Sequence, residues 1–475
     1  MTPSWVLLDT YVDLCFDEED GEASASAPVS AAPIPEGSAA VSATAPTTLE
    51  SMRNSTIAFL RSMTPDAVLH DPPKVSAIRL RSSGRRQDAA ALAVDAAVAC
   101  ADKSLLVLYG GRYAGPGSSP RGCYLIYDAA VSSTGGGGGT LTLTSTVPPV
   151  PLSWYITSVG FGAVALRSPP PSSSYLLAEL ATSSEHQIPD AELYLWRHHS
   201  DDSPPPQWEK KAVRMPDEVC RAPGKHNFCV DTAFSLGAST LCWVDLLNGI
   251  VVYNDDAQRH VDHPHLRFVP LPDGCPAAAP SDDDYPLYRP CAQEFRAAAA
   301  CATGGAIKLV VMEGYLEDWD SHEFRLVTWT LAPDLSGWTK DAVFRLTDIW
   351  ASDRYLALKI PEHTPVCPVL SPVDDGVVYA VVNDVEVCNV HKVVKGSEVV
   401  ETKVDIKGQY VLGIDVRRNV VVSTDCCCGG FPSLVQLTPR LLATDFCAWL
   451  KAPKDRQREV NASEVGESGK KPKVS

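Results

Sequence analysis

The sequence predicts a mainly β fold, β-propeller-like, with roughly six blades of antiparallel sheet. Three observations favour this fold class. Short apolar runs recur along most of the chain and are bounded by Gly, Pro, Asp or Ser, which is typical of strands. Helical periodicity is weak. A faint internal repeat places a similar pair of strands at several points, as a ring of similar sheets requires.

The apolar runs define the expected strands. They are rich in Val, Leu, Tyr and Trp, which fit a pleated, partly buried surface. Helices are expected only over residues 51–63, before Pro65, and in a short piece around Ala443–Leu450. The predicted strands are Leu105–Tyr109, Tyr124–Tyr127, Ala191–Trp196, Leu241–Val244, Ile250–Tyr253, Ile307–Met312, Phe324–Leu331, Val377–Val382 and Val420–Ser423.

The repeat is clearest in two segments, 193–214 and 326–343. Each contains a strand, a polar loop and a second strand that begins Trp-x-Lys-x-Ala-Val, at Trp208 and at Trp338. Looser copies elsewhere indicate a unit of about 65 residues. One such unit cannot cover its own apolar faces, so we expect the units to stack radially. The alternative is a pair of β-sandwich domains.

Composition divides the chain into four parts. Residues 1–20 are expected to be an N-terminal strand segment, and residues 52–450 a β-propeller-like body. Residues 21–50 are rich in Ala, Ser and Pro, and residues 451–475 are mostly polar. Neither can bury enough apolar surface to offset chain entropy, so a disordered insert and a disordered tail are expected there.

Charge and length exclude several classes of protein. The 475 residues include 41 Lys plus Arg and 58 Asp plus Glu, which gives a net charge of −17. This acidity disfavours nucleic acid and anionic lipid as partners. No apolar run approaches the ~18 residues of a membrane span. The 15 cysteines form no disulfide framework, and no basic residue precedes the short apolar run at Met1–Tyr11. We therefore expect reduced thiols and a cytoplasmic or nuclear location.

A histidine cluster is the first candidate for chemistry. His260, Asp262, His263 and His265 lie close together, and neutral imidazole is a good zinc ligand. Pro264 interrupts the group, however, and no second ligand group stands at metal-site spacing. The sequence therefore favours a solvated hairpin loop here.

Other candidates are weaker still. The run Cys426–Cys428 lacks C-x-x-C spacing and reads as a strand end before a Gly turn. The acidic runs Asp17–Asp20 and Asp282–Asp284 lack the ligand pattern of a calcium loop. Motifs of serine hydrolases, P-loops, zincins and dinucleotide-binding proteins are missing. We therefore predict no catalytic, cofactor-binding or metal-ligating residue, although a triad assembled from distant positions stays open.

Several short motifs occur together in the second half of the chain. In this order they closely resemble the plant family named domain of unknown function 1618 (DUF1618), with the domain expected over about 241–385. The resemblance implies no activity and no catalytic residue, because the family has no established biochemical function. The motifs are Leu241–Val252, Arg267–Pro272, Gly305–Lys308, Trp329–Leu331, Trp350, Pro368–Ser371 and Asn383–Asp384.

The residues that carry this resemblance read as structural. Trp243 and Trp329 lie in strand patterns where large rings bury well, so we expect a core role rather than ligand contact. Gly249 stands between two strands, where a tight turn favours a residue without Cβ. Asp245 and Asn248 are expected to bond the backbone of that turn.

The leading functional hypothesis is a non-catalytic scaffold that binds an unknown protein partner through loops. Loops vary at little cost to a fold and often carry binding residues. The alternative is a hydrolase or carbohydrate-active enzyme that uses a central cleft, which convergent Asp, Glu or His side chains with shifted pKa values would favour. The loops 254–266 and 313–323 are the candidate interaction region, with His260, His263, Trp319 and His322 as its candidate residues.

Overall fold

The computed structural model is mainly β. The disordered insert was predicted over residues 21–50 and the disordered tail over 451–475. Residues 21–48 and the tail lie outside the described residues. Leu49 and Glu50 begin a helix, which corrects the predicted end of the insert. The residues described are 3–16, 49–82, 94–111, 122–130, 141–150, 155–156, 162–168, 174–183, 190–199, 206–220, 228–275, 289–301, 305–316, 320–359, 361–394, 397–427 and 437–450.

All nine strands predicted from apolar runs are confirmed. Their alternating or continuous apolar pattern is local, so it survives whatever the tertiary arrangement is. They are β5 (Leu105–Gly111), β6 (Cys123–Asp128), β11 (Asp190–His198), β14 (Thr240–Asp245), β15 (Gly249–Asn254), β18 (Ile307–Glu313), β19 (Arg325–Leu331), β22 (Val377–Val394) and β24 (Val420–Cys426).

The predicted N-terminal helix is confirmed as α1 (Leu49–Ser62), which buries Leu60 in an apolar cluster. The expected final helix is corrected: β25 (Leu441–Thr444) precedes a 3-10 turn, η3 (Phe446–Leu450). None of the described helices is long and apolar enough to cross a membrane. The other short helices are α3 (Asp217–Cys220), α4 (Asp255–Gln258), η1 (Ala292–Glu294), η2 (Ser321–Glu323), α5 (Leu346–Trp350) and α6 (Asp353–Leu358).

The strands form six groups, named here sheets A to F. Sheets A and B join through β1 and β4 into one eight-stranded sheet, and the described strands all pair antiparallel except β1 with β3. Sheet A holds β1 (Val6–Phe16), β2 (Thr64–Val68), β3 (Val75–Ser82) and β25; B holds β4 (Asp95–Asp102), β5, β6 and β7 (Thr142–Val147); C holds β8 (Tyr155–Ile156), β9 (Val164–Arg167), β10 (Tyr175–Ser183), β11 and β12 (Trp208–Arg214). Sheet D holds β13 (Thr232–Leu236), β14, β15 and β16 (Arg267–Pro270); E holds β17 (Arg296–Ala300), β18, β19 and β20 (Trp338–Arg345); F holds β21 (Val366–Leu370), β22, β23 (Ser397–Asp415) and β24.

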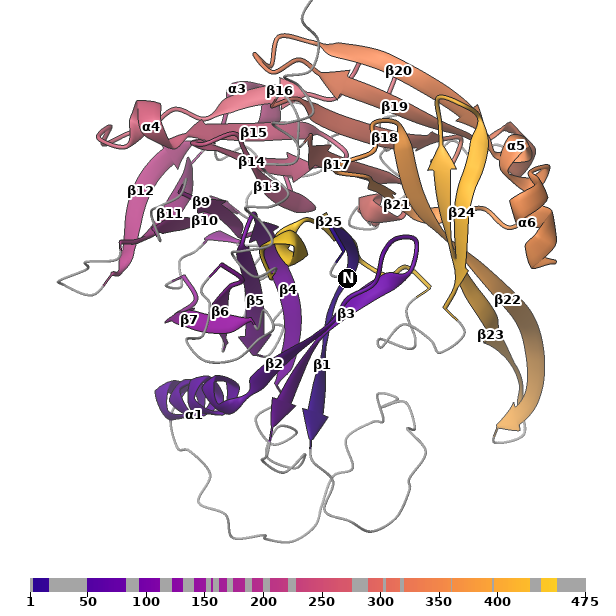
Figure 1. Ribbon diagram of the computed structural model, residues 1–475, viewed down its shortest axis with the longest axis horizontal. Coiled ribbons are helices and arrows are strands. Elements are labelled where there is room, and N and C mark those ends of the chain that lie inside the picture. The colour runs from indigo at the N-terminus through magenta and orange to yellow at the C-terminus, as the bar shows by residue number, and fades with distance from the viewer. Residues whose placement is uncertain are drawn as a thin grey trace, which may run out of the picture.

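One strand of each sheet contacts its counterpart in the next sheet. The series runs β4, β9, β13, β17, β21 and β25, and β25 pairs with β1, which joins β4. Figure 1 shows β13, β17, β21 and β25 toward the middle of the molecule and β7, β12 and β20 farther out. The order of contacts leads from each sheet to the next and favours a ring over two separate sandwiches. Closure into a six-bladed propeller stays a prediction.

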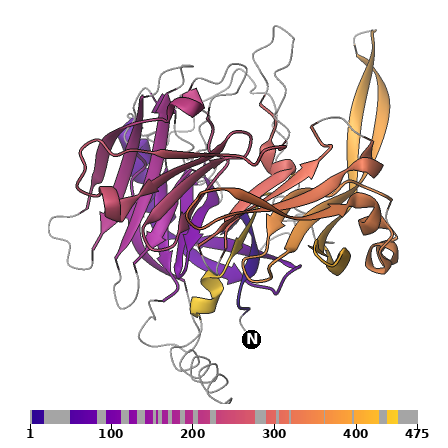
Figure 2. The same cartoon turned by 90° about the horizontal axis from the view of Figure 1, so that it is seen from above.

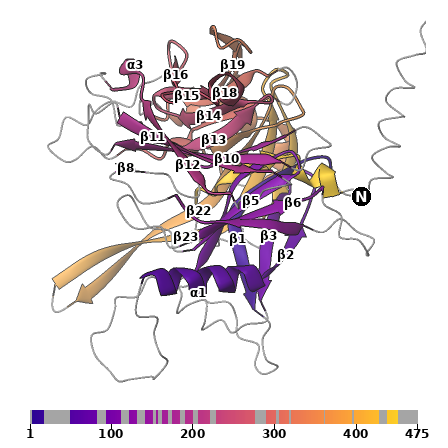
Figure 3. The same cartoon turned by 90° about the vertical axis from the view of Figure 1, so that its left-hand side faces the viewer.

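One hairpin extends beyond its sheet. β22 pairs with β21 only as far as Val381, and β23 pairs with β24 only from Tyr410, yet β22 and β23 pair with each other through Val394 and Ser397. The views in Figures 1, 2 and 3 all show this hairpin projecting away from the other sheets.

Most of the described cysteines carry no disulfide. Eleven of them are free, and several, such as Cys100 and Cys242, are buried. Cys426, at the end of β24, is disulfide-bonded and departs from the expectation of reduced thiols.

The two tryptophans of the sequence repeat lie in like surroundings. Trp208 Nε1 donates to the carbonyl oxygen of Pro148 at 2.8 Å, and Trp338 Nε1 donates to that of Pro270 at 2.8 Å. Pro148 follows the last strand of sheet B, and Pro270 ends the last strand of sheet D. Each tryptophan is the first residue of its sheet's last strand, and it is hydrogen-bonded to the end of the last strand of the preceding sheet or to the residue that follows it.

We expect Trp208→Phe and Trp338→Phe each to lower the free energy of unfolding by about 1 kcal/mol, because each removes one hydrogen bond between sheets. The effects should add, since the two contacts lie in different interfaces. Urea denaturation measures both. Trp329→Phe is the matched control, because Trp329 Nε1 has no hydrogen-bond partner in the part of the chain that the structure describes. An equal loss in the control would contradict this role of the indole N–H groups.

Candidate functional site

The loop 254–266 joins β15 to β16 in sheet D and carries two of the predicted interaction residues. His260 and His263 are both exposed. Between them Val261 is 39% exposed. The loop therefore presents two imidazoles and an apolar side chain to solvent.

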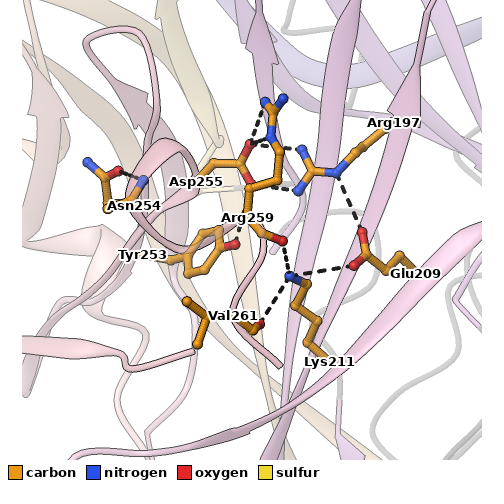
Figure 4. A network of polar contacts seen from close by, with 9 residues as sticks. Arg197, Glu209, Lys211, Tyr253, Asn254, Asp255, Arg259 and Val261 are labelled. Atoms are coloured by element: carbon orange, nitrogen blue, oxygen red, sulfur yellow. Dashed lines mark hydrogen bonds and ion pairs between the residues drawn. The ribbon is translucent and has the colours of Figure 1, made fainter. Parts of the chain in front are cut away.

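Asp255 fastens the start of this loop to sheet C. Its carboxylate is buried and accepts two hydrogen bonds from Arg197 of β11, at 2.8 and 2.6 Å. Arg259 donates to the same carboxylate at 3.0 Å, and the Tyr253 hydroxyl at 3.3 Å (Figure 4). Burial raises the pKa of Asp255, but the two guanidinium groups outweigh it and hold that pKa below its usual value. The anchor is therefore charged at neutral pH.

Lys211 fastens the middle of the loop. This lysine of β12 is buried, and its Nζ donates to the carbonyl oxygens of Arg259 at 2.6 Å and Val261 at 3.3 Å. Glu209 lies 3.5 Å from the same ammonium group. Figure 4 shows Lys211 pointing from its strand toward these loop carbonyls. The ammonium group thus satisfies backbone oxygens that precede and follow His260.

Local bonds hold the remaining parts of the loop. Asn254 Oδ1 accepts from the Ala257 N–H at 2.9 Å and so caps the short helix α4. The Gln258 side chain makes two hydrogen bonds to the backbone of His265: its Nε2 donates to the carbonyl oxygen, and its Oε1 accepts from the N–H. The backbone of His265 also bridges to Arg214 of β12. The loop is therefore fixed in shape on both sides of the exposed His263.

The second predicted loop, 313–323, lies in sheet E between β18 and β19. His322 is exposed and meets the Trp350 ring edge-on, with centroids 5.2 Å apart. Asp320 Oδ1 accepts from the His322 N–H at 3.0 Å. Trp319 lies outside the described residues.

The two loops lie near opposite ends of β19. Arg267, which follows the first loop, donates to the carbonyl oxygens of Asp334 and Leu335, in the turn after β19 ends. The loop 313–323 directly precedes the start of β19. The structure therefore brings His260 and His263 together in one loop, near the end of β19, and places His322 near the start of β19.

A group of thiols lies near the start of β13, β17 and β21, the first strands of sheets D, E and F. Cys229 precedes β13, Cys291 precedes η1 and β17, and Cys367 lies in β21, while Arg440 directly precedes β25. Burial raises the pKa of all three thiols, to about 12 for Cys367, although Arg440 opposes the rise. They are therefore protonated near neutral pH and are poor nucleophiles. Within the described ranges, no three His, Cys, Asp or Glu side chains are grouped so that they could hold a metal ion.

Two buried carboxylates lie beside these thiols and share one arginine. Arg289 donates to both oxygens of Asp231, at 2.9 and 2.6 Å, and to Asp245 at 2.9 Å. Burial raises the pKa of Asp231, and Arg289 acts against that rise. Backbone N–H groups also donate to Asp245, from Cys229 at 2.8 Å and Leu247 at 2.9 Å. Both carboxylates are thus engaged in holding the fold.

The predicted turn after β14 is confirmed. Asp245 accepts from the backbone N–H and the side-chain amide of Asn248. Gly249 has φ +152°, and a Cβ there would stand 2.5 Å from the Val269 carbonyl oxygen. Nothing in the sequence marks Lys211 as buried or Arg289 as the partner of two buried carboxylates, because Arg259 lies 48 residues from Lys211 and Asp231 lies 58 residues from Arg289.

A family model described as "Protein of unknown function (DUF1618)" matches residues 243–379. The chain contains a DUF1618 domain. This confirms the predicted DUF1618 domain and falls inside the expected range of about 241–385. The DUF1618 domain begins in β14, includes all of sheet E and ends in β22. It therefore contains the loop 254–266 and Arg289, whereas Lys211 and Arg197 lie outside it. No curated protein matches the chain.

Proposed function

We propose that this DUF1618 domain-containing protein is a non-catalytic scaffold that binds a protein partner through the loop 254–266. The observation that carries the proposal is the buried pair of anchors, Asp255 and Lys211, beneath exposed His260 and His263. A loop already fixed in its bound shape loses little conformational entropy when a partner docks. Two imidazoles and an exposed valine offer hydrogen bonds and apolar contact to that partner.

The competing function is a hydrolase or carbohydrate-active enzyme with its site near the starts of β13, β17 and β21. The convergent groups there are Asp231, Asp245 and three protonated thiols. Carboxylates already bound by Arg289 and by backbone N–H groups are poorly placed to act as general acid or base, which favours the scaffold.

We extend the proposal to the body of the protein. We propose that sheets A to F close as a six-bladed ring. The order of contacts along the series β4, β9, β13, β17, β21 and β25 supports this. The proposed location is the cytoplasm or nucleus, supported by the many free thiols.

The test is affinity purification of the tagged full chain from its native tissue, followed by mass spectrometry. We expect the wild-type chain to recover a partner reproducibly. The double variant His260→Ala/His263→Ala should recover it at least about tenfold less well, because loss of central contacts typically costs more than 1 kcal/mol. These side chains are exposed, so the variant should keep the wild-type unfolding midpoint.

His322→Ala is the matched control, since it removes an exposed imidazole at the other end of β19. It should leave recovery of the partner unchanged. Equal recovery by the double variant would contradict binding through this loop. An empty purification together with turnover in a panel of hydrolase substrates would replace the scaffold with the enzyme.

A further inference from the structure

Sheets B and C enclose a carboxyl group that the proposed scaffold function does not use. Glu179 of β10 is 1% exposed. The Tyr124 hydroxyl of β6 donates to its Oε1 at 2.6 Å, across the interface between the two sheets. Its other oxygen, Oε2, is buried without a hydrogen-bond partner among the described residues. A carboxylate in this position would lack the partners that a buried charge needs.

Among the described residues, no cation is paired with Glu179. It shares a strand face with Tyr175 and Leu177, which pack in the apolar cluster between the sheets. The tyrosine phenols and the cysteine thiol around Glu179 are neutral at pH 7, so none of them supplies a positive charge. Arg53 of α1 acts on the pKa of Tyr109 but is not among the groups that shift the pKa of Glu179. The titratable groups around it among the described residues are Cys100, Tyr109 and Tyr124 in sheet B and Tyr175 and Tyr194 in sheet C. Glu192 and Lys210 lie on the same face of sheet C, and they form an ion pair with each other.

We propose that Glu179 is a proton-dependent latch: its protonated carboxyl keeps sheets B and C packed together, and its ionisation favours opening of their contact. The protonated group is neutral and fits the apolar cluster. The ionised group is stabilised only when the sheets separate far enough to admit water to Oε2.

The direction of the pH effect follows from the two states. Burial raises the pKa of Glu179 from its ordinary 4.5 to about 7 in the closed state, although the bond from Tyr124 opposes the rise. In the opened state the carboxyl is hydrated and its pKa returns to the ordinary value. Between these two values only the opened state ionises, so the opening equilibrium constant rises about tenfold per pH unit. Above about pH 7 it levels off, about 300-fold higher than at low pH.

Native-state hydrogen exchange of the full chain tests this, with rates corrected for intrinsic exchange at each pH. We expect the backbone amides of β6 and β10 to lose protection as pH rises from 5 to 7 in the wild-type chain. Glu179→Gln carries no ionisable group at this position and should show no such slope. The same pH profile in the wild-type chain and in Glu179→Gln would overturn the latch.

Two further variants keep the test decisive if Glu179→Gln folds poorly. Tyr124→Phe removes the donor to the carboxylate, so the loss of protection should level off at a higher pH, and an unchanged profile would overturn the proposal. Glu192→Gln is the control, because this carboxylate in β11 has both Tyr194 and Lys210 as partners. It should keep the wild-type slope, whereas loss of the slope would assign the effect to Glu192 and reject the latch.

Discussion

Replacing Arg289 with leucine is expected to lower the free energy of unfolding by about 3–5 kcal/mol. Arg289 is the cation shared by Asp231 and Asp245, whose side chains are 4% and 0% exposed. Leucine keeps much of the volume but leaves both carboxylates buried without their counter-charge. The expected loss is therefore mostly the cost of these unpaired charges and not the strength of the original ion pairs.

Urea denaturation at several pH values checks this result. The deficit of Arg289→Leu should shrink as pH falls, because protonation neutralises the two stranded carboxyl groups. Arg417→Leu is the matched control: it removes an arginine paired with Asp375, and both side chains are about half exposed. Exposed pairs contribute roughly 0–1 kcal/mol. A deficit for Arg289→Leu no larger than that of the control would show that water reaches the two carboxylates.

The second large effect is expected at Trp243, the residue with which the DUF1618 match begins. Trp243→Ala should lower the free energy of unfolding by about 3–5 kcal/mol. Trp243 is fully buried in a cluster that includes Leu193 of sheet C and Val251 of sheet D. Its Nε1 donates to the Gly162 carbonyl oxygen at 3.0 Å. Alanine would leave a cavity between the sheets and an unpaired buried carbonyl.

A second variant separates the two contributions. Trp243→Phe keeps most of the ring but loses the N–H donor, so it should cost clearly less than alanine, about 1–3 kcal/mol. Thermal or urea unfolding measures both variants. If alanine cost no more than phenylalanine, the ring would contribute little packing, and a ligand-contact role for Trp243 would regain support over the core role.

Local features of this protein could be predicted from its sequence because they depend on neighbouring residues. Apolar runs such as Ile307–Met312 became strands, and the helix before Pro65 formed within two residues of its expected ends. The turn at Asp245 was predictable because its bonds join residues only two or three positions apart. The likeness of Trp208 and Trp338 was predictable because their strand pattern repeats.

Short elements and long-range partners were not predictable in this way. β25 pairs with β1, so Val6 lies opposite Thr444, and no local pattern records that pairing. η3 was mistaken for part of a helix because a few apolar residues fit a strand end, a 3-10 turn or a helix equally well. Lys211 and Arg289 looked like ordinary solvated side chains.

The sequence by itself determined which segments are strands, where the turn at Asp245 lies and that residues 243–379 form a DUF1618 domain. The tertiary structure alone decided how charges are paired and buried: Asp231 and Asp245 are bound by Arg289, Lys211 lies beneath the loop 254–266, and Glu179 has no cation partner among the described residues. The physical reason is range. Hydrophobic periodicity acts over a few residues, whereas the burial and pairing of a charge depend on which distant strands pack beside it.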